Sequence, residues 1–236
     1  MKHLLVATVL SAVFIGGGAT PSYAQYAPDG IYLMTRMWIS SFEMDVYYFG
    51  PGIAVNAPSY DIAAYGTSYA EEQNPGTVGD VSFTGGTMRI DWHDGDVTEA
   101  DLEPSSGGCF NFDGGLFCPV EKFSSSTLSG VFHGGAAVGG GTSAFASSGQ
   151  TLLFQEDGRY AMGSTTVVDS IAGGVDATAY SDQAEAGQYT ISGNSIEFYP
   201  DGGQAWSTAS FPYHDDALPG AFPNRIYFDG VMMSRQ

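Results

Sequence analysis

Pairs of turn-forming residues divide most of this sequence into short segments in which apolar and polar residues alternate. In one such segment Val81, Phe83, Met88, Ile90 and Trp92 share a phase, which is typical of β-strands with one buried face. The turn pairs between the segments suit the positive φ angles of tight hairpins; they are Gly85-Gly86, Asp94-Gly95, Asp113-Gly114, Asp157-Gly158, Gly193-Asn194 and Asp229-Gly230. The sequence therefore predicts consecutive antiparallel hairpins and an all-β fold.

The same order of hairpins occurs twice along the chain. The aligned segments are 46–55 with 152–162, 79–95 with 187–202, and 110–118 with 226–234. We interpret the order as a tandem duplication of one antiparallel meander, with units at 25–121 and 122–236, because internal repeats of this kind mark repeated structural units. Each unit is expected to form a small barrel or sandwich, since closure removes exposed strand edges. The alignment places Trp92 and Phe198 at corresponding inward positions; the alternative is that hairpins of any meandering β protein look alike.

One pattern in the second unit resembles that of a known fold family. An apolar strand is followed by Asp157, Gly158 and Tyr160, and then by GQYTISGN at 187–194. This pattern resembles lipocalin-like proteins, the calycins. The resemblance implies a small up-and-down barrel for each unit, and it assigns no functional residues.

The first 24 residues have the pattern of a secretory signal peptide. Lys2 and His3 precede an apolar run from Leu4 to Ile15, and small residues end at Ala24. This order predicts cleavage after Ala24 and a secreted or periplasmic protein. No later segment approaches the roughly 20 apolar residues that a membrane helix requires, so we expect no membrane span.

The composition narrows the classes of partner. The chain has a formal net charge of −19, and it is 43% hydrophobic and 14% aromatic. A strongly acidic protein repels the phosphate backbone, so nucleic acid is not an expected partner. The apolar content is sufficient for a core. The expected partner is an unknown small molecule or a protein of the cell envelope.

The two cysteines are expected to form a structural disulfide. If Asp113 and Gly114 form a two-residue turn, Cys109 and Cys118 become a non-hydrogen-bonded cross-strand pair with Cα atoms about 4.5 Å apart. A metal site would need further ligands nearby, and a redox pair would need Cys-x-x-Cys spacing. The aligned positions of the second unit are Arg225 and Ser234, so the bridge belongs to one unit alone.

The densest group of charges is the acidic run at 91–103. It does not fit a calcium-binding loop, because the glycine register would place Ile90 and Trp92 at ligand positions. We expect a hairpin in which His93 opposes Asp96, which would raise the pKa of His93. The histidines of the chain show no metal-binding spacing, so the sequence predicts no metal site, no other cofactor and no defined catalytic residues.

Three longer segments have no clear strand pattern. Residues 57–78 are expected to contain a short helix capped by Ser59, with Ile62, Tyr65 and Tyr69 on one face, lying over a barrel mouth as a lid. The alternative is a packing helix without a ligand. Residues 134–149 are interpreted as a flexible glycine-rich connector, and 165–186 as a long loop.

The sequence favours a binding module over an enzyme. The expected ligand is a small uncharged or cationic molecule, or a protein, held in a barrel mouth or in a groove between the units. The candidate contacts are Tyr60, Tyr65, Tyr69, Trp92 and His93. One alternative is a structural or interaction protein of the cell envelope with filled barrels and no ligand. The other is a hydrolase that uses His93 or His214 with a neighbouring carboxylate.

Overall fold

The structure, a computed structural model, describes residues 27–39, 42–139, 144–172, 175–213 and 222–236. Strands make up most of these residues, so the predicted all-β fold is confirmed. The expected signal peptide and His214 lie outside the described residues. No helix in the described part of the chain is long and apolar enough to cross a membrane.

The first sheet has nine antiparallel strands in the order β6-β5-β4-β3-β2-β1-β9-β8-β7. Its strands are β1 (Gly30–Met37), β2 (Phe42–Gly50), β3 (Ile53–Asn56), β4 (Val78–Thr84), β5 (Thr87–Trp92), β6 (Val97–Asp101), β7 (Glu103–Pro104), β8 (Phe110–Phe112) and β9 (Gly115–Pro119). A short 3-10 helix, η3 (Ser106–Gly108), lies between β7 and β8. The sheet curls into a near-barrel that stays open, because β6 and β7 are its two edges.

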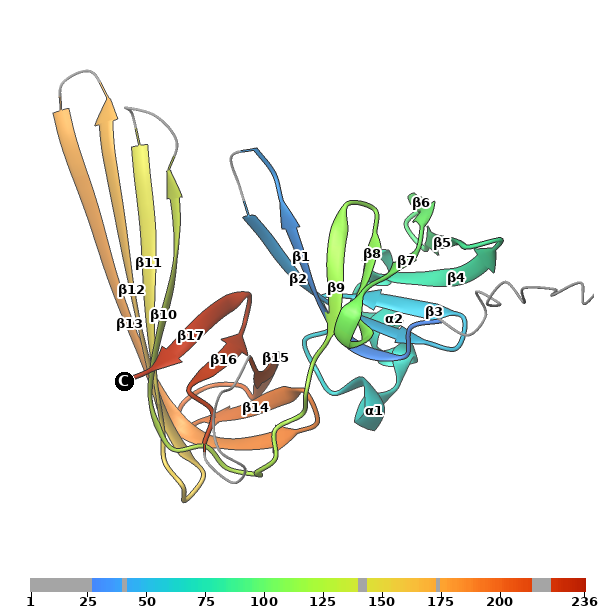
Figure 1. Ribbon diagram of the computed structural model, residues 1–236. Helices are drawn as coiled ribbons and strands as arrows, with labels where there is room; N and C mark the ends of the chain where they lie inside the picture. The colour runs from blue at the N-terminus through green and yellow to red at the C-terminus, as the bar shows by residue number, and fades with distance from the viewer. Residues whose placement is uncertain (1–26, 40–41, 140–143, 173–174, 214–221) are drawn as a thin grey trace, which may run out of the picture.

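The second sheet is a closed antiparallel barrel in which each strand pairs with its neighbours in the sequence and β17 returns to β10. Its strands are β10 (Gly130–Gly139), β11 (Ala144–Phe154), β12 (Arg159–Ala172), β13 (Val175–Ser192), β14 (Ser195–Pro200), β15 (Trp206–Pro212), β16 (Arg225–Phe228) and β17 (Val231–Arg235). Figure 1 shows the barrel beside the near-barrel, with β10 to β13 extending well beyond the rest of it.

Several hairpins occur in the same order in both sheets. The β8–β9 turn at Asp113 and the β16–β17 turn at Asp229 both have positive φ, 47° and 46°, and both are followed by a glycine, as two-residue hairpins require. In each sheet the last strand pairs with the first, β9 with β1 and β17 with β10. The structure thus has two tandem β units whose strands follow a similar order, with β7 as an additional edge strand in the first.

The register corrects one detail of the alignment. Gly79 lies opposite Trp92, and Gly187 lies opposite Pro200. Trp92 therefore corresponds to Pro200, and Phe198 corresponds to Ile90, both of which are fully buried. The predicted Trp92–Phe198 equivalence is wrong by two residues, because the offset of 108 that aligns Gly79 with Gly187 also aligns Trp92 with Pro200. The inward phase itself is confirmed, since Trp92 packs against the core of its unit.

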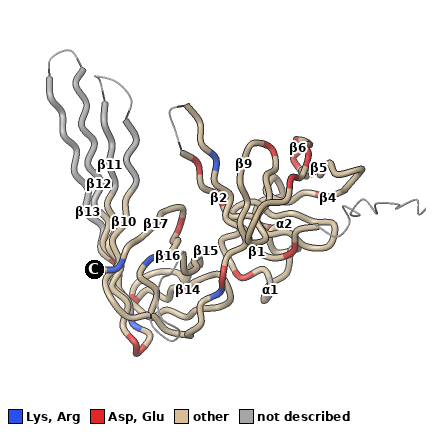
Figure 2. Tube along the Cα trace, in the orientation of Figure 1, with Lys and Arg blue, Asp and Glu red and all other residues tan. Residues whose placement is uncertain are grey.

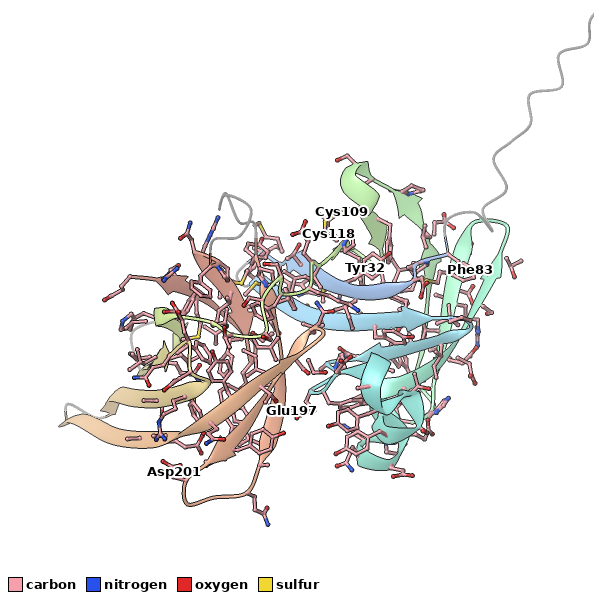
Figure 3. The ribbon with its side chains drawn as sticks, turned by 90° about the horizontal axis from the view of Figure 1, so that it is seen from below. Tyr32, Phe83, Cys109, Cys118, Glu197 and Asp201 are labelled. Carbon is pink, nitrogen blue, oxygen red and sulfur yellow. A yellow bond between two sulfur atoms is a disulfide. The ribbon has the colours of Figure 1, made fainter. Side chains whose placement is uncertain are left out.

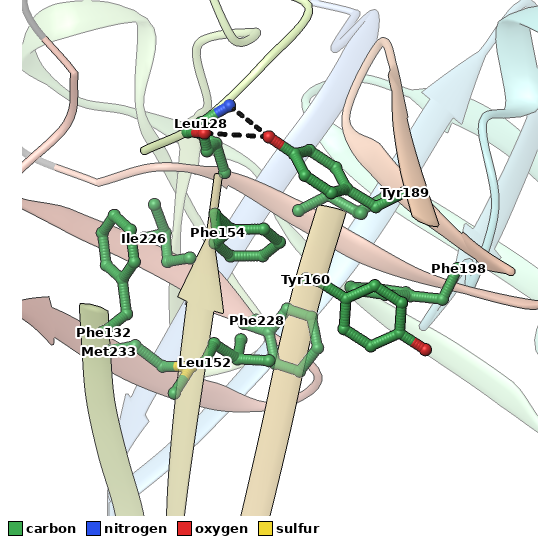
Figure 4. Packing of buried hydrophobic residues seen from close by; sticks show 11 residues of the cluster. Leu128, Phe132, Leu152, Phe154, Tyr160, Tyr189, Phe198, Ile226, Phe228 and Met233 are labelled. Atoms are coloured by element: carbon green, nitrogen blue, oxygen red, sulfur yellow. Dashed lines mark hydrogen bonds between the residues drawn. The ribbon is translucent and has the colours of Figure 1, made fainter. Parts of the chain in front are cut away.

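Each unit has its own aromatic core. In the barrel, Phe154 contacts Tyr189 with ring centroids 4.8 Å apart, and Phe198 stacks on Trp206 at 4.4 Å. Figure 4 shows Phe154, Tyr189 and Phe198 packed together with other buried residues of the barrel. In the near-barrel, Phe110 stacks on Phe117 with centroids 5.0 Å apart. These rings come from positions of one phase in each strand, as the alternating pattern requires.

The segment between β3 and β4 forms two short helices, α1 (Ile62–Tyr65) and α2 (Thr67–Gln73), and a 3-10 turn, η2 (Pro75–Thr77). Ile62 and Ala70 pack on Val55 and Val78 at the outer face of the first sheet. The expected lid over a barrel mouth is therefore wrong. The predicted cap at Ser59 is also wrong, because α1 begins at Ile62.

The described residues of two segments expected to be irregular are strands instead. Residues 134–139 and 144–149 belong to β10 and β11, and residues 165–172 and 175–186 belong to β12 and β13. These segments contain mostly small and hydroxyl side chains. The contrast between apolar and polar positions that marks a strand is therefore weak in them.

Apolar side chains join the two units. Leu33 and Val46 point outward from the first sheet and pack on Phe211 and Tyr227 of the barrel, and all four are buried. Phe211 and Tyr227 stack with centroids 4.8 Å apart. The strand β1 is therefore buried on both faces, which explains the unbroken run Ile31 to Met34.

The predicted disulfide is confirmed. Cys109 and Cys118 are bonded, with Cα atoms 4.2 Å apart, and Figure 3 shows them on the near-barrel. The turn register is the expected one, since Phe112 pairs with Gly115 and Phe110 with Phe117. Arg225 and Ser234 form the corresponding cross-strand pair of the barrel.

Candidate functional site

The three tyrosines predicted as ligand contacts come together. Tyr60 contacts Tyr69 edge to face with ring centroids 4.7 Å apart, and it contacts Tyr65 at 6.0 Å. The rings of Tyr65 and Tyr69 are 5.6 Å apart. The three rings form one aromatic wall because Gly66, with φ of 78°, separates α1 from α2 and turns the chain between them.

The facing wall belongs to the barrel. The residues that line the cavity between the two walls are Ser59, Tyr60, Tyr65, Tyr69, Glu197, Tyr199, Ala205, Trp206 and Ser207. The cavity measures about 440 Å³. We call it the tyrosine groove. Figure 3 places Glu197 on the barrel, on the side that faces the helices of the first unit.

Hydrogen bonds between the units hold the groove together. The Tyr65 hydroxyl donates to Glu197 Oε1 at 2.7 Å, and the Ser207 hydroxyl donates to the Ser59 carbonyl at 2.8 Å. Beside them Ser192 donates to Asp61 Oδ2 at 2.8 Å. Both units therefore shape the groove.

The charge of the groove is set by Glu197. Its Oε2 accepts a hydrogen bond from the Tyr199 hydroxyl at 2.7 Å. The hydrogen bonds from Tyr199 and then Tyr65 lower the pKa of Glu197, because they stabilise the charged form. The same bonds raise the pKa values of Tyr65 and Tyr199. At neutral pH the groove thus holds one carboxylate among neutral phenols.

Tyr60 is the most buried of the three tyrosines in the aromatic wall. Burial, followed by the neighbouring Tyr69, raises the pKa of Tyr60 to about 12. Its hydroxyl oxygen is buried without a hydrogen-bond partner of ordinary geometry, although the backbone of Ala70 lies close enough to lower its pKa slightly. The rings above it stay accessible: Tyr65 is 51% exposed and Tyr199 is 44% exposed.

Trp92 lies elsewhere. It lines a separate cavity of about 290 Å³ on the inner side of the near-barrel, together with Tyr47 and Asn56, and its indole donates to Thr98 Oγ1 at 2.9 Å. The barrel has a larger cavity of about 580 Å³ at the corresponding place. There Met162 and Pro200 occupy the positions of Asn56 and Trp92.

The prediction that His93 opposes Asp96 is wrong. Trp92 pairs with Asp96 through a backbone bond of 2.9 Å, so His93 lies in the hairpin loop between them. Its Nδ1 lies 2.7 Å from Glu71 Oε1 on α2, and its Nε2 lies 3.6 Å from Asp80. The pKa of His93 is raised, as expected, but the main cause is the hydrogen bond with Glu71. His93 does not line the groove.

The two described histidines have different partners. His93 contacts the carboxylates of Glu71 and Asp80, and His133 Nδ1 lies 3.0 Å from the Thr151 hydroxyl. The described part of the chain contains no group of three or more His, Cys, Asp or Glu side chains able to hold a metal ion.

Sequence reasoning found only one wall of the groove. Glu197, Tyr199 and Trp206 were not predicted, because they come from the other unit. Glu197 and Tyr199 stand on the outward phase of β14, while Ile196 and Phe198 are buried. The signal available in the sequence was an acidic residue, Glu197, and an aromatic residue, Tyr199, on the same outward face of one strand.

Comparisons with known proteins do not assign the chain to a family. No family model matches it, and no curated protein or solved structure is significantly similar to it. The geometry of the groove is therefore the basis for a function.

Proposed function

We propose that this protein is an exported binding module whose tyrosine groove holds a small molecule. The observation that carries the proposal is the convergence of five aromatic side chains from both units on one cavity of about 440 Å³. Cavities of this size and lining are where proteins bind small ligands.

The partial exposure of the rings supports a ligand. Tyr69 is 40% exposed and Tyr199 is 44% exposed, so the rings are not needed to fill a core. Tyrosine supplies a large apolar surface and loses little conformational entropy on binding, because its side chain has two rotatable bonds. A ligand that covers these rings would remove apolar surface from water.

Export is supported by two features. Residues 1–24 have the pattern of a signal peptide. The described cysteines are paired in a disulfide, which is typical of oxidising compartments. The described helices include none that could span a membrane.

A second candidate function is docking to an envelope protein. The tip of the β1–β2 hairpin exposes Met37, Trp38 and Ile39, with exposed fractions of 80%, 55% and 109%. Clustered exposed apolar residues mark interaction surfaces. If docking is the function, the double substitution Trp38→Ser and Ile39→Ser abolishes it and leaves ligand retention in the groove unchanged.

The proposed function is tested by native mass spectrometry of protein purified from the organism that produces it. We expect a bound small molecule in the wild type and its loss in Ala205→Phe, which fills the groove without removing a hydrogen bond. The matched control is Ala186→Phe, which fills the 580 Å³ cavity of the barrel and should retain the molecule. Wild-type protein without any adduct, or loss in the control alone, would contradict the proposal.

A further inference from the structure

We infer that the ligand of the tyrosine groove is an organic cation with a methylated ammonium group. The inference rests on the proposed function and names the chemical class of the ligand. It follows from the charge, the rings and the hydrogen bonds of the groove.

The charge of the groove excludes anions. Glu197 is ionised at neutral pH, since its hydrogen bonds lower its pKa, and the residues that line the groove include no Lys, Arg or His. No ion pair of the described residues involves Glu197. Acidic side chains are spread over both units, whereas basic ones are few (Figure 2). A cation is the ligand that compensates this charge.

The rings provide the second part of the argument. The faces of Tyr and Trp carry negative electrostatic potential, so they attract a cation placed over them. Tyr60, Tyr65 and Tyr69 meet one another at angles of 86°, 84° and 35°, and therefore present differently inclined surfaces to the cavity. Trp206 of the barrel also lines the cavity, and one face of its ring is stacked on Phe198. A compact cation can contact several of these rings at once.

The hydrogen bonds decide between a primary and a methylated ammonium. Each oxygen of Glu197 accepts a bond from a tyrosine hydroxyl, which leaves one lone pair open on each oxygen, and the Ser207 hydroxyl donates to a carbonyl. A primary ammonium carries three N–H donors, which lose water on binding and need acceptors. A fully methylated ammonium has no such donor, so the aromatic lining suits it better.

The test uses choline as the probe and its neutral carbon isostere, 3,3-dimethylbutan-1-ol, as the matched control. Isothermal titration calorimetry on the full mature chain should give a Kd for choline about tenfold lower than for the isostere. Ethanolamine, which keeps the charge but has N–H donors in place of methyl groups, should also bind more weakly than choline. Equal or tighter binding of the isostere or of ethanolamine would overturn the inference.

Two variants test whether Glu197 is responsible for the stronger binding of choline. Glu197→Gln should weaken choline binding about tenfold and leave the isostere unchanged, whereas Glu103→Gln, which removes an exposed charge from β7, should change neither. If choline binds with the same affinity to Glu197→Gln as to the wild type, the inference is wrong.

The failure of this inference is distinguishable from that of the proposed function. If choline does not bind but a native molecule is lost in Ala205→Phe, the groove binds a ligand of another class and only the inference fails. If neither choline nor a native molecule occupies the groove, both fail.

Discussion

The hydroxyl of Tyr189 holds two segments of this molecule together by hydrogen bonds. Tyr189 is 3% exposed, and its hydroxyl accepts a hydrogen bond from the Leu128 amide at 2.7 Å. The same hydroxyl lies 2.9 Å from the Leu128 carbonyl and 3.1 Å from the Gln155 carbonyl. It thus ties the segment before β10 to the β11–β12 turn, as the dashed lines in Figure 4 show in part.

Removal of this hydroxyl should destabilise the fold. Tyr189→Phe keeps the ring but leaves the buried Leu128 amide without a partner, which costs about 1–3 kcal/mol. Urea unfolding measures the change. Tyr199→Phe is the control, since that hydroxyl is at an exposed position, and it should change stability by less than about 0.5 kcal/mol. Equal midpoints for the two variants would refute this role of Tyr189.

The pairing of His93 with Glu71 predicts a dependence of stability on pH. Because the pKa of His93 is raised in the folded state, the pairing stabilises the fold fully below the unfolded pKa of about 6.5, and the effect is lost as pH rises through the folded pKa. Glu71→Gln should therefore lower the pKa of His93 in an NMR titration. It should lower the urea midpoint at about pH 5.5 and not at about pH 8.5.

The adjacent Glu72→Gln is the control for this titration, since it removes an equal charge from α2. An unchanged pKa of His93 in Glu71→Gln would contradict the pairing, as would an equal shift in both variants.

At the level of elements, the register of a hairpin could be predicted where its turn residues were identified correctly. Strands without a clear alternation of apolar and polar residues could not be predicted. The Asp113-Gly114 turn fixed the register of its hairpin, and with it the disulfide, because a two-residue turn determines every pair that follows. The loop that holds His93 was assigned two residues instead of three, which displaced the pairing with Asp96. The long strands β12 and β13 were missed because their small and hydroxyl residues hide the alternation.

Gly79 on β4 and Gly187 on β13 occupy equivalent positions in the two units, and Gly187 gives a prediction at this scale. A Cβ on Gly187 would meet the Tyr199 carbonyl oxygen and the Pro200 backbone, so Gly187→Ala should destabilise the protein by about 1–3 kcal/mol. Gly163→Ala, on β12, meets no atom within 4 Å and should be neutral or slightly stabilising. Thermal unfolding distinguishes them, and a tolerated Gly187→Ala would contradict the close approach of β13 and β14.

For the whole molecule, the packing of one unit against the other creates the site. The sequence predicted Tyr60, Tyr65 and Tyr69 because they lie within one short segment. It did not reveal Glu197 or the barrel wall, since contacts between distant segments depend on how the units dock. Buried Leu33 and Phe211 at that junction show that the docking is apolar. The function proposed here therefore depends on an arrangement that neither unit has alone.

The most direct test of this arrangement is cross-linking between the two walls of the groove. Ser59 and Ser207 face each other across the junction, with the hydroxyl of one 2.8 Å from the carbonyl of the other. The double variant Ser59→Cys and Ser207→Cys should form a link with a short bis-maleimide, seen by mass spectrometry after proteolysis. Phe83→Cys with Ser207→Cys is the control, because Figure 3 places Phe83 on the side of the first unit away from the barrel. Efficient linking of the first pair alone is the predicted result; no link, or equal linking in the control, would contradict the docked units and the groove between them.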